Sequence, residues 1–318
     1  MATYSHRLFD RKDLDIFLSI YWDKKQCDHQ FWIKVHGEFS LLFSRPGCTN
    51  LTLLNEAGEA IAFLSTALLK PSFVEILKSA SEPDIVTKLV ADDSVLFVER
   101  DIADGNAREE LCGCVIAFSI VNSIHEAEIP IIKSHLMDLV VEAFSGYLLQ
   151  EIYIEVHTEE LIDNLFRAGF CVANDYSSWW EEHLNEREVC PKLMSVDKHT
   201  ARLAKDFHVL RMFVADPPKL ALTDVHRETL YWALQDRTNE EICEELDLNN
   251  DALVARWRSI YLKCSRILPG DPVQSFRKRG DEKRRKVIRY VREHPEELRP
   301  YNYKLILPAN GRTPGKRS

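Results

Sequence analysis

Residues 222–268 read LTDVHRETLYWALQDRTNEEICEELDLNNDALVARWRSIYLKCSRIL, and this stretch predicts three short helices. Thr223 is a typical N-cap for a first helix that runs to about Leu234. Thr238 caps a second helix, and Glu241 three residues later completes a capping box. After a break at 247–249, apolar residues at helical spacing predict a third helix: Leu253, Trp257, Ile260, Tyr261 and Cys264. Two short helices and a turn before a longer helix is the geometry that places a helix in the DNA major groove.

The opposite face of the third helix carries Asp251, Ala255, Arg258, Ser259 and Arg266. Arg258 and Ser259 point directly away from the apolar stripe, so we expect them to contact bases. We expect other residues in or beside the second and third helices mainly to position the module on the duplex: Thr238, Asn249, Asn250, Ala255, Arg256, Lys263 and Arg266.

This segment resembles, without a gap, the LuxR/GerE-type helix-turn-helix domain of bacterial transcription regulators. The matching positions are Leu222-Thr223, Glu228, Leu230, Thr238-Asn239, Glu241-Ile242, Leu246, Leu253, Ile260 and Lys263. The resemblance implies a four-helix DNA-binding module, usually dimeric, with residues 250–266 as the recognition helix. Three positions depart from the family: Asp236 replaces the usual glycine, Asn249 the usual serine and Val254 the usual lysine. Losing the cation at position 254 weakens the attraction to phosphate.

Charge is distributed unevenly along the 318 residues, whose formal net charge is -9. Residues 1–221 carry -14, residues 222–268 carry -3, and residues 269–318 carry +8. An acidic body with a basic end is typical of a chain whose end faces a polyanion. We expect tail cations to bind DNA phosphates: Arg277, Lys278, Arg279, Lys283 and Arg284. Apolar spacing within the tail predicts a helix over 283–293, and its Gly/Pro-rich end is expected to be disordered.

The adjacent prolines in VADPPKLALTD (214–224) mark the main domain boundary. We predict an α+β chain: a mixed α/β sensing or interaction domain (1–213), a linker (214–221), an all-α helix-turn-helix domain (222–268) and a basic extension (269–318). In the first domain, strands are expected within 51–64, 94–100, 112–121, 151–156 and 171–176, and helices over 131–144 and 159–170.

The strand, short helix and strand that end the first domain faintly resemble the last third of the GNAT acetyltransferase fold, over roughly residues 94–180. Active members hold the pyrophosphate of acetyl-CoA on a glycine-rich turn at a helix N-terminus. The matching segment here, IPIIKSHLM (129–137), contains no glycine. Because side chains there keep the backbone away from a phosphate, we expect the chain not to be an enzyme and to need no cofactor.

The remaining sequence patterns argue against a membrane helix and against a metal site. No apolar stretch reaches the roughly 20 residues of a membrane helix, so a cytoplasmic bacterial protein without membrane contact is expected. The eight cysteines lack paired metal-knuckle spacing, and no metal site is expected.

We predict a DNA-binding transcription regulator with double-stranded DNA as its partner. A homodimer and a small-molecule or protein effector at the N-terminal domain stay open. Two alternatives are a protein-interaction adaptor whose helix-turn-helix no longer binds DNA, and an acetyltransferase fused to a DNA-binding domain. The target sequence, the effector and the direction of regulation are not encoded in any pattern found here.

Overall fold

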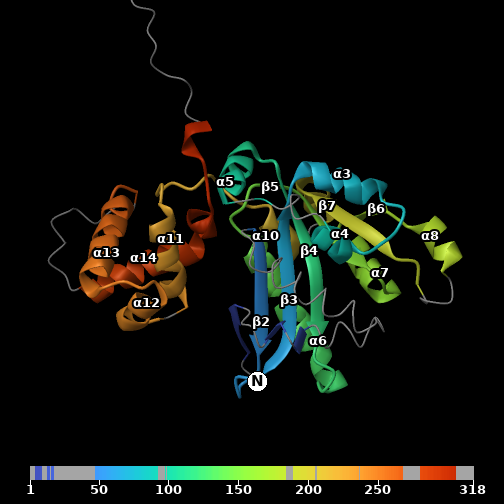
Figure 1. Cartoon of the computed structure of the whole chain (residues 1–318), viewed down its shortest axis with the longest axis horizontal. Coiled ribbons are helices and arrows are strands. Elements are labelled where there is room, and N and C mark those ends of the chain that lie inside the picture. Colours follow the sequence, from blue (N-terminus) through green and yellow to red (C-terminus); the bar gives the residue numbers. More distant parts are fainter. Residues whose placement is uncertain are drawn as a thin grey trace, which may run out of the picture.

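The computed structural model describes residues 4–8, 13–14, 16–17, 47–91, 97, 99–183, 189–204, 206–235, 237–267 and 280–305. It shows a mixed α/β body followed by a helical domain (Figure 1). The predicted fold class is therefore confirmed. Among the described residues, no helix is both long and apolar enough to cross a membrane.

A seven-stranded sheet in the order β1-β2-β3-β4-β5-β7-β6 forms the centre of the body. Its strands are β1 (Ser5–Leu8), β2 (Cys48–Leu54), β3 (Ala60–Leu69), β4 (Leu111–Ile120), β5 (Leu149–Val156), β6 (Cys171–Asn174) and β7 (Lys192–Asp197). The β4–β5 pair is parallel, whereas every other pair of described strands is antiparallel. Strand β3 and most of β4 are buried on both faces, so helices cover both sides of the sheet.

Helices cover the two faces in separate layers. One face packs against α5 (Glu99–Arg108), α6 (Ile129–Phe144), α7 (Glu159–Arg167), α9 (Lys198–Ala204) and α10 (Phe207–Met212). The other packs against α3 (Pro71–Ser79) and α4 (Ile85–Ala91), which Figure 1 shows in front of the strands. The parallel strands need a long crossover connection, and α6 provides it.

Most elements expected in the body are present, namely the strands at 51–64, 112–121, 151–156 and 171–176 and the two helices. The strand predicted at 94–100 is wrong at its end, because Glu99 begins helix α5; residues 94–96 and 98 lie outside the described residues. Strand β7 was not anticipated, and it inserts between β5 and β6. A short helix, α8 (Ser177–Glu182), precedes it.

The helical domain contains α11 (Asp224–Leu234), α12 (Asn239–Glu245), α13 (Asn250–Cys264) and α14 (Gly280–Glu293). Thr238 and Asn249 cap α12 and α13 through their side-chain oxygens, as the sequence indicates. The expected apolar stripe of α13 faces a common core with α11, and Val287 and Val291 of α14 join it. The helix of the basic tail is thus part of the domain core rather than a separate appendage.

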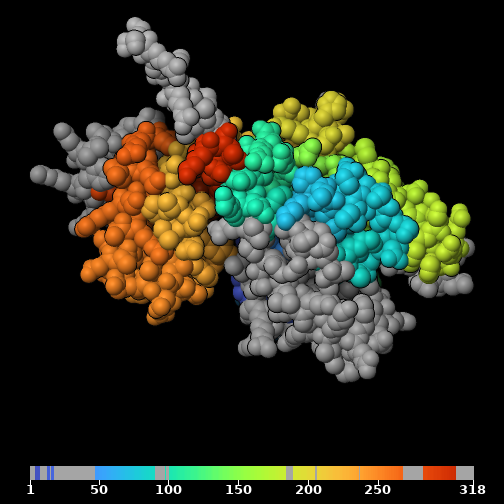
Figure 2. Space-filling model, turned by 45° about the horizontal axis from the view of Figure 1, so that its top comes forward, coloured from blue at the N-terminus to red at the C-terminus, as the bar shows by residue number. Residues whose placement is uncertain are grey.

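A C-terminal strap, which we define as residues 294–305, joins the helical domain to the body. It contains the 3-10 turns η4 (Pro295–Leu298) and η5 (Tyr303–Leu305). Figure 2 shows this red segment between the orange helical domain and α5. Buried Asn106 of α5 donates to Pro300 O at 2.9 Å, and Asn302 N donates to Ala103 O at 3.1 Å.

Arg299 of the strap caps the C-terminal end of α6. Its Nε donates to Ser145 O at 2.8 Å, and its Nη2 donates to Glu142 O at 2.9 Å and to Ala143 O at 3.3 Å. The guanidinium also lies 4.5 Å from the ring centroid of Tyr147. A cation bonded to the last carbonyls of a helix is favoured by the helix dipole, so Arg299 fixes the strap to the body.

On the other side of the strap, buried Glu297 receives Lys219 N at 3.0 Å and Leu220 N at 2.9 Å. These amides belong to the segment that leads into α11, and the hydroxyl of Tyr290 on α14 also donates to Glu297. The strap therefore bonds the linker, α14 and the body at once.

We predict that Arg299→Ala lowers the free energy of unfolding by about 2 kcal/mol, because three carbonyls lose a charged donor and Tyr147 loses its stacked cation. Urea denaturation followed by tryptophan fluorescence measures this. Arg289→Ala is the matched control, because Arg289 is 82% exposed on α14 and bonds only within its own helix; we expect a change below about 0.5 kcal/mol. Equal losses of unfolding free energy in the two variants would show that Arg299 does not fix the strap to the body.

Candidate functional site

The sheet opens between β4 and β5. Their pairing runs from Leu111↔Leu149 to Val115↔Ile154 and stops there, although β4 continues to Ile120. Against β3, Val115 pairs with Thr66 and Ala117 with Ser65, which leaves Ile116 as an extra residue in β4. Such a bulge bends its strand and often lies beside a functional site. It separates the carboxyl ends of the two parallel strands.

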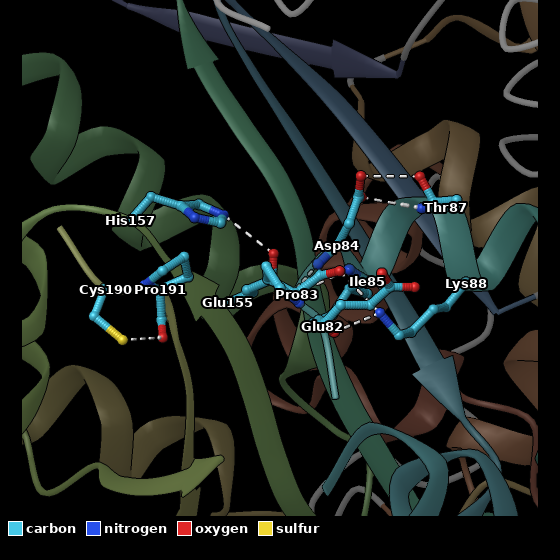
Figure 3. A network of polar contacts seen from close by, with 10 residues as sticks. All are labelled: Glu82, Pro83, Asp84, Ile85, Thr87, Lys88, Glu155, His157, Cys190 and Pro191. Atoms are coloured by element: carbon cyan, nitrogen blue, oxygen red, sulfur yellow. Dashed lines mark hydrogen bonds and ion pairs between the residues drawn. The ribbon is translucent and has the colours of Figure 1, made fainter. Parts of the chain in front are cut away.

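Polar groups of β5 line one face of the sheet beside this opening. Glu151, Tyr153 and Glu155 alternate along the strand, so all three point to the α3–α4 side. The Glu155 carboxylate, whose side chain is only 8% exposed, accepts Asp84 N at 2.7 Å and Ile85 N at 3.2 Å. Glu155 thus holds the start of α4 against the end of β5 (Figure 3).

His157 forms a pair with Glu155 at the end of the opening. The two atoms His157 Nε2 and Glu155 Oε1 lie 3.1 Å apart, and the imidazole is 37% exposed (Figure 3). A buried carboxylate that bonds an accessible imidazole sets its tautomer and the orientation of its ring. This arrangement can accept a proton from an incoming nucleophile.

Tyr176 brings a hydroxyl to the same region. Its side chain is buried, and among the described residues its oxygen has no hydrogen-bond partner. Burial, together with the nearby charges of Glu155 and Cys114, raises the pKa of Tyr176. Its backbone lies in the left-handed region at φ 48°, which is strained for a residue with a side chain. A buried, unpaired and protonated hydroxyl is available as a donor to a bound group.

The two cysteines of β4 lie on this face as well. Burial raises the pKa of the Cys112 thiol to about 11 and that of Cys114 further. Both thiols therefore stay protonated near neutral pH, so neither is a prepared nucleophile. Among the described residues, no group of three or more His, Cys, Asp or Glu side chains could hold a metal ion.

The opposite side of the opening is the start of α6, where the GNAT resemblance implies the pyrophosphate of coenzyme A. The connection from β4 to α6 contains the 3-10 turn η2 (Glu126–Glu128), both of whose glutamates are exposed. It has no glycine, and Pro130 stands in the first turn of α6. These residues do not fit a pyrophosphate, so no step is derived through coenzyme A.

A candidate nucleic-acid interface lies on α13, which Figure 1 shows on the outer side of the helical domain. Its exposed stripe consists of Asp251, Val254, Ala255, Arg258, Leu262 and, just beyond the helix, Arg266. Asn250 is exposed at the helix start, and Ser259 is half-buried beside the stripe. Arg258 and Arg266 are thus the two predicted DNA-binding cations that point outward from this helix.

Two other predicted DNA-binding cations are engaged with α11. Arg256 lies 3.8 Å from the carboxylate of Glu228 and donates to Val225 O at 3.4 Å. Lys263 Nζ donates to Ala221 O at 2.5 Å. Burial, followed by the charges of Lys263, Arg256 and Arg227, lowers the pKa of His226. Three cations therefore lie near His226 at the start of α11, and two of them are paired with carboxylates: Arg227 with Asp224 and Arg256 with Glu228.

Of the five tail cations predicted to bind DNA, Lys283 and Arg284 lie among the described residues. Arg284 bonds Asn239 Oδ1 at 3.2 Å and Arg237 O, and its guanidinium lies 5.5 Å from the Trp257 ring centroid. It therefore stabilises the packing of α14 on the other helices. Lys283 also has a partner. Arg277, Lys278 and Arg279 lie outside the described residues, as does the end predicted to be disordered.

No protein-family profile matches the chain, and no curated protein matches it in sequence. Several solved structures are similar to about two thirds of it. FeeM, an N-acyl amino acid synthase from uncultured soil microbes, is 10% identical, with 64% of this chain and 95% of that chain covered and a TM-score of 0.36. A spermidine N-acetyltransferase SpeG mutant from Vibrio cholerae is 10% identical, with 64% and 98% covered and a TM-score of 0.40. Arabidopsis thaliana NAA60 in complex with acetyl-CoA is 14% identical, with 61% and 99% covered and a TM-score of 0.35.

These neighbours correct one expectation. The prediction that the chain is not an enzyme is wrong in light of them, since proteins described as N-acetyltransferases recur among them. The missing glycines led to that prediction, but they bear on one cofactor group and not on catalysis as a whole. The GNAT resemblance of the body is supported, whereas the comparisons contain nothing that supports the LuxR/GerE resemblance.

Sequence reasoning did not identify Glu155, His157 and Tyr176. A signal for the first was present in EIYIEV, where carboxylates recur at alternate positions of an otherwise apolar strand and so face a largely buried layer. Tyr176 gave no such signal, because its burial depends on residues distant in sequence.

We predict that Glu155→Gln increases hydrogen exchange at the Asp84 and Ile85 amides by about tenfold or more, since a charged acceptor is lost. Hydrogen-exchange mass spectrometry of the peptide spanning α4 measures this. Glu151→Gln is the matched control, because Glu151 lies on the same strand face but bonds Tyr153 and Lys78 instead. Unchanged exchange in Glu155→Gln would show that α4 is held by other contacts.

Proposed function

We propose that the N-terminal body transfers an acyl group from a thioester to an amine. The single observation that carries this proposal is the Glu155–His157 pair at the end of the opening between the parallel strands. In open sheets, ligands bind at the carboxyl ends of parallel strands, where neighbouring strands diverge. The bulge at Ile116 and the end of the β4–β5 pairing define such a place.

In this mechanism His157 is the general base. Its imidazole accepts a proton from the attacking amine while the amine nitrogen forms a bond to the acyl carbon. The carbon–sulfur bond then breaks, and the leaving thiolate takes the proton back from the imidazolium. Glu155 acts through His157, because its carboxylate orients the imidazole ring. No proton or electron is left over, and no metal or redox partner is needed.

Tyr176 is proposed as the hydrogen-bond donor at the reacting centre. Its raised pKa keeps the hydroxyl protonated at neutral pH. A donor that is already fixed in a buried environment stabilises developing negative charge more effectively than water does. Because Tyr176 has no partner among the described residues, a substrate oxygen or thiolate can satisfy it without displacing another bond.

We predict that His157→Gln lowers kcat for transfer from S-acetyl-N-acetylcysteamine to a primary amine by about 100-fold or more. Liquid chromatography with mass detection of the amide product measures the rate. His208→Gln is the control, since His208 is exposed on α10 and pairs with Asp138 away from the opening. A rate in His157→Gln equal to that of the control would remove His157 from the mechanism.

A second candidate function is binding of double-stranded DNA by the helical domain. The observation that favours it is the capped α12–α13 turn, which leaves Arg258 exposed in the middle of a continuous 15-residue helix. Arg256 and Lys263 of α13 border the exposed stripe, where we expect them to attract phosphate beside this helix. Acidic residues of α12, including Glu240 and Glu244, oppose it, so the affinity is expected to depend strongly on where the tail cations lie.

We predict that Arg258→Ala weakens binding to the preferred duplex by about 10-fold and relaxes preference at one base pair, as expected for a base contact. Gel-shift titration against sequences selected from a random duplex pool measures both. Arg211→Ala on α10 is the control for a general loss of positive charge. If affinity and preference are both unchanged, Arg258 does not face DNA. If the unaltered chain shows no salt-dependent retention of DNA, the adaptor alternative replaces this function.

The remaining expectations about partners follow from this second function and stay predictions. A homodimer would place two α13 helices on half-sites of a palindrome, and enrichment of a palindrome in the same selection tests it. An effector would bind the body, for which the opening between β4 and β5 is the candidate location. The cytoplasmic location also stays a prediction.

A further inference from the structure

The last part of the β4–α6 connection, residues 127–130, has its backbone donors already occupied. Ala127 N donates to His125 Nδ1 at 3.2 Å, and Glu128 N donates to His125 O at 2.9 Å. Ile129 N donates to Glu126 O, and Pro130 has no N–H to offer. Four consecutive residues at the start of α6 therefore present no free amide. A helix start binds a phosphate through such amides, so residues 127–130 lack the donors that phosphate binding requires.

The charges near the opening also disfavour a bound phosphate. Glu126 and Glu128 are exposed at the start of α6, where they complement the positive end of the helix dipole that a phosphate would otherwise use. Glu159 and Glu160 occupy the first turn of α7, the next helix along the sheet. Lys133, one turn into α6, lies 2.9 Å from Glu160, so this cation is already paired.

We infer that the turn before α6 does not hold a nucleotide pyrophosphate, so the acyl donor of this chain is bound through its thioester and thiol arm. This inference rests on the acyl transfer proposed above. Two independent observations carry it: the occupied amides from Ala127 to Ile129, followed by Pro130, and the glutamates that begin both helices beside the opening. A pyrophosphate placed at residues 127–130 would lose its hydration, gain no amide donor from these four residues and lie near the carboxylates that begin the two helices.

The decisive measurement compares two ligands that share one thiol arm and differ in the phosphates. Isothermal titration calorimetry of the full chain with coenzyme A and with pantetheine gives the contribution of the nucleotide directly. We expect the two affinities to agree within about threefold, or both to be weaker than about 1 mM. Binding of coenzyme A about 10-fold or more tighter than pantetheine would overturn the inference.

Turnover provides a second and separate readout. With a primary amine as acceptor, kcat/KM for S-acetyl-pantetheine is expected to lie within about threefold of that for acetyl-CoA, since the phosphates add no binding energy. A preference of about 30-fold for acetyl-CoA would overturn the inference. If neither thioester gives product, the proposed acyl transfer fails, whereas the calorimetric comparison still decides whether the chain holds the pyrophosphate.

Discussion

The parallel pairing of β4 with β5 is the constraint on which the rest of the body depends. Two parallel neighbours cannot be joined by a tight turn, so a crossover must travel the length of the sheet, and α6 does so. The extra residue at Ile116 then ends the pairing before either strand ends. The bulge therefore forms the opening at whose end Glu155 and His157 lie.

Helix α6 connects this opening to the helical domain through its two ends. Its start carries Glu126 and Glu128, and its end is capped by Arg299. The glutamates just before the first turn and the Arg299 guanidinium at the last carbonyls both complement the helix dipole. The arrangement stabilises α6 without any ligand. It also uses the helix start, which related folds can offer to a phosphate, for purely internal hydrogen bonds.

Local patterns predicted most of the helical domain, whereas long-range packing determined the parts that sequence reasoning missed. Caps such as Thr238 and Asn249 act within four residues, so they can be identified without knowing the fold. Strand β7 and helix α5 instead depend on neighbours far away in the chain. The segment before α5 contains strand-forming residues, but Glu99 to Arg108 is polar at helical spacing and packs Ile102 inward. Glu155 and His157 are only two residues apart, but the burial of Glu155 depends on its contact with the start of α4, which the segment by itself does not show.

Helical periodicity also could not predict which cations of α13 stay available. It gives the angle at which a side chain leaves the helix, but not whether a neighbouring carbonyl lies within its reach. Arg256 and Lys263 leave at angles that border the exposed stripe, and both are long enough to bond carbonyls at the start of α11. Among the described residues, no carbonyl accepts a hydrogen bond from the side chain of Arg258 or Arg266. Two outward cations, with Val254 and Leu262 exposed on the same stripe, are few for a major-groove helix, so a larger part of any DNA affinity must come from outside α13. The cations around His226 are not such a source, because Arg256 and Lys263 belong to α13 and Arg227 pairs with Asp224.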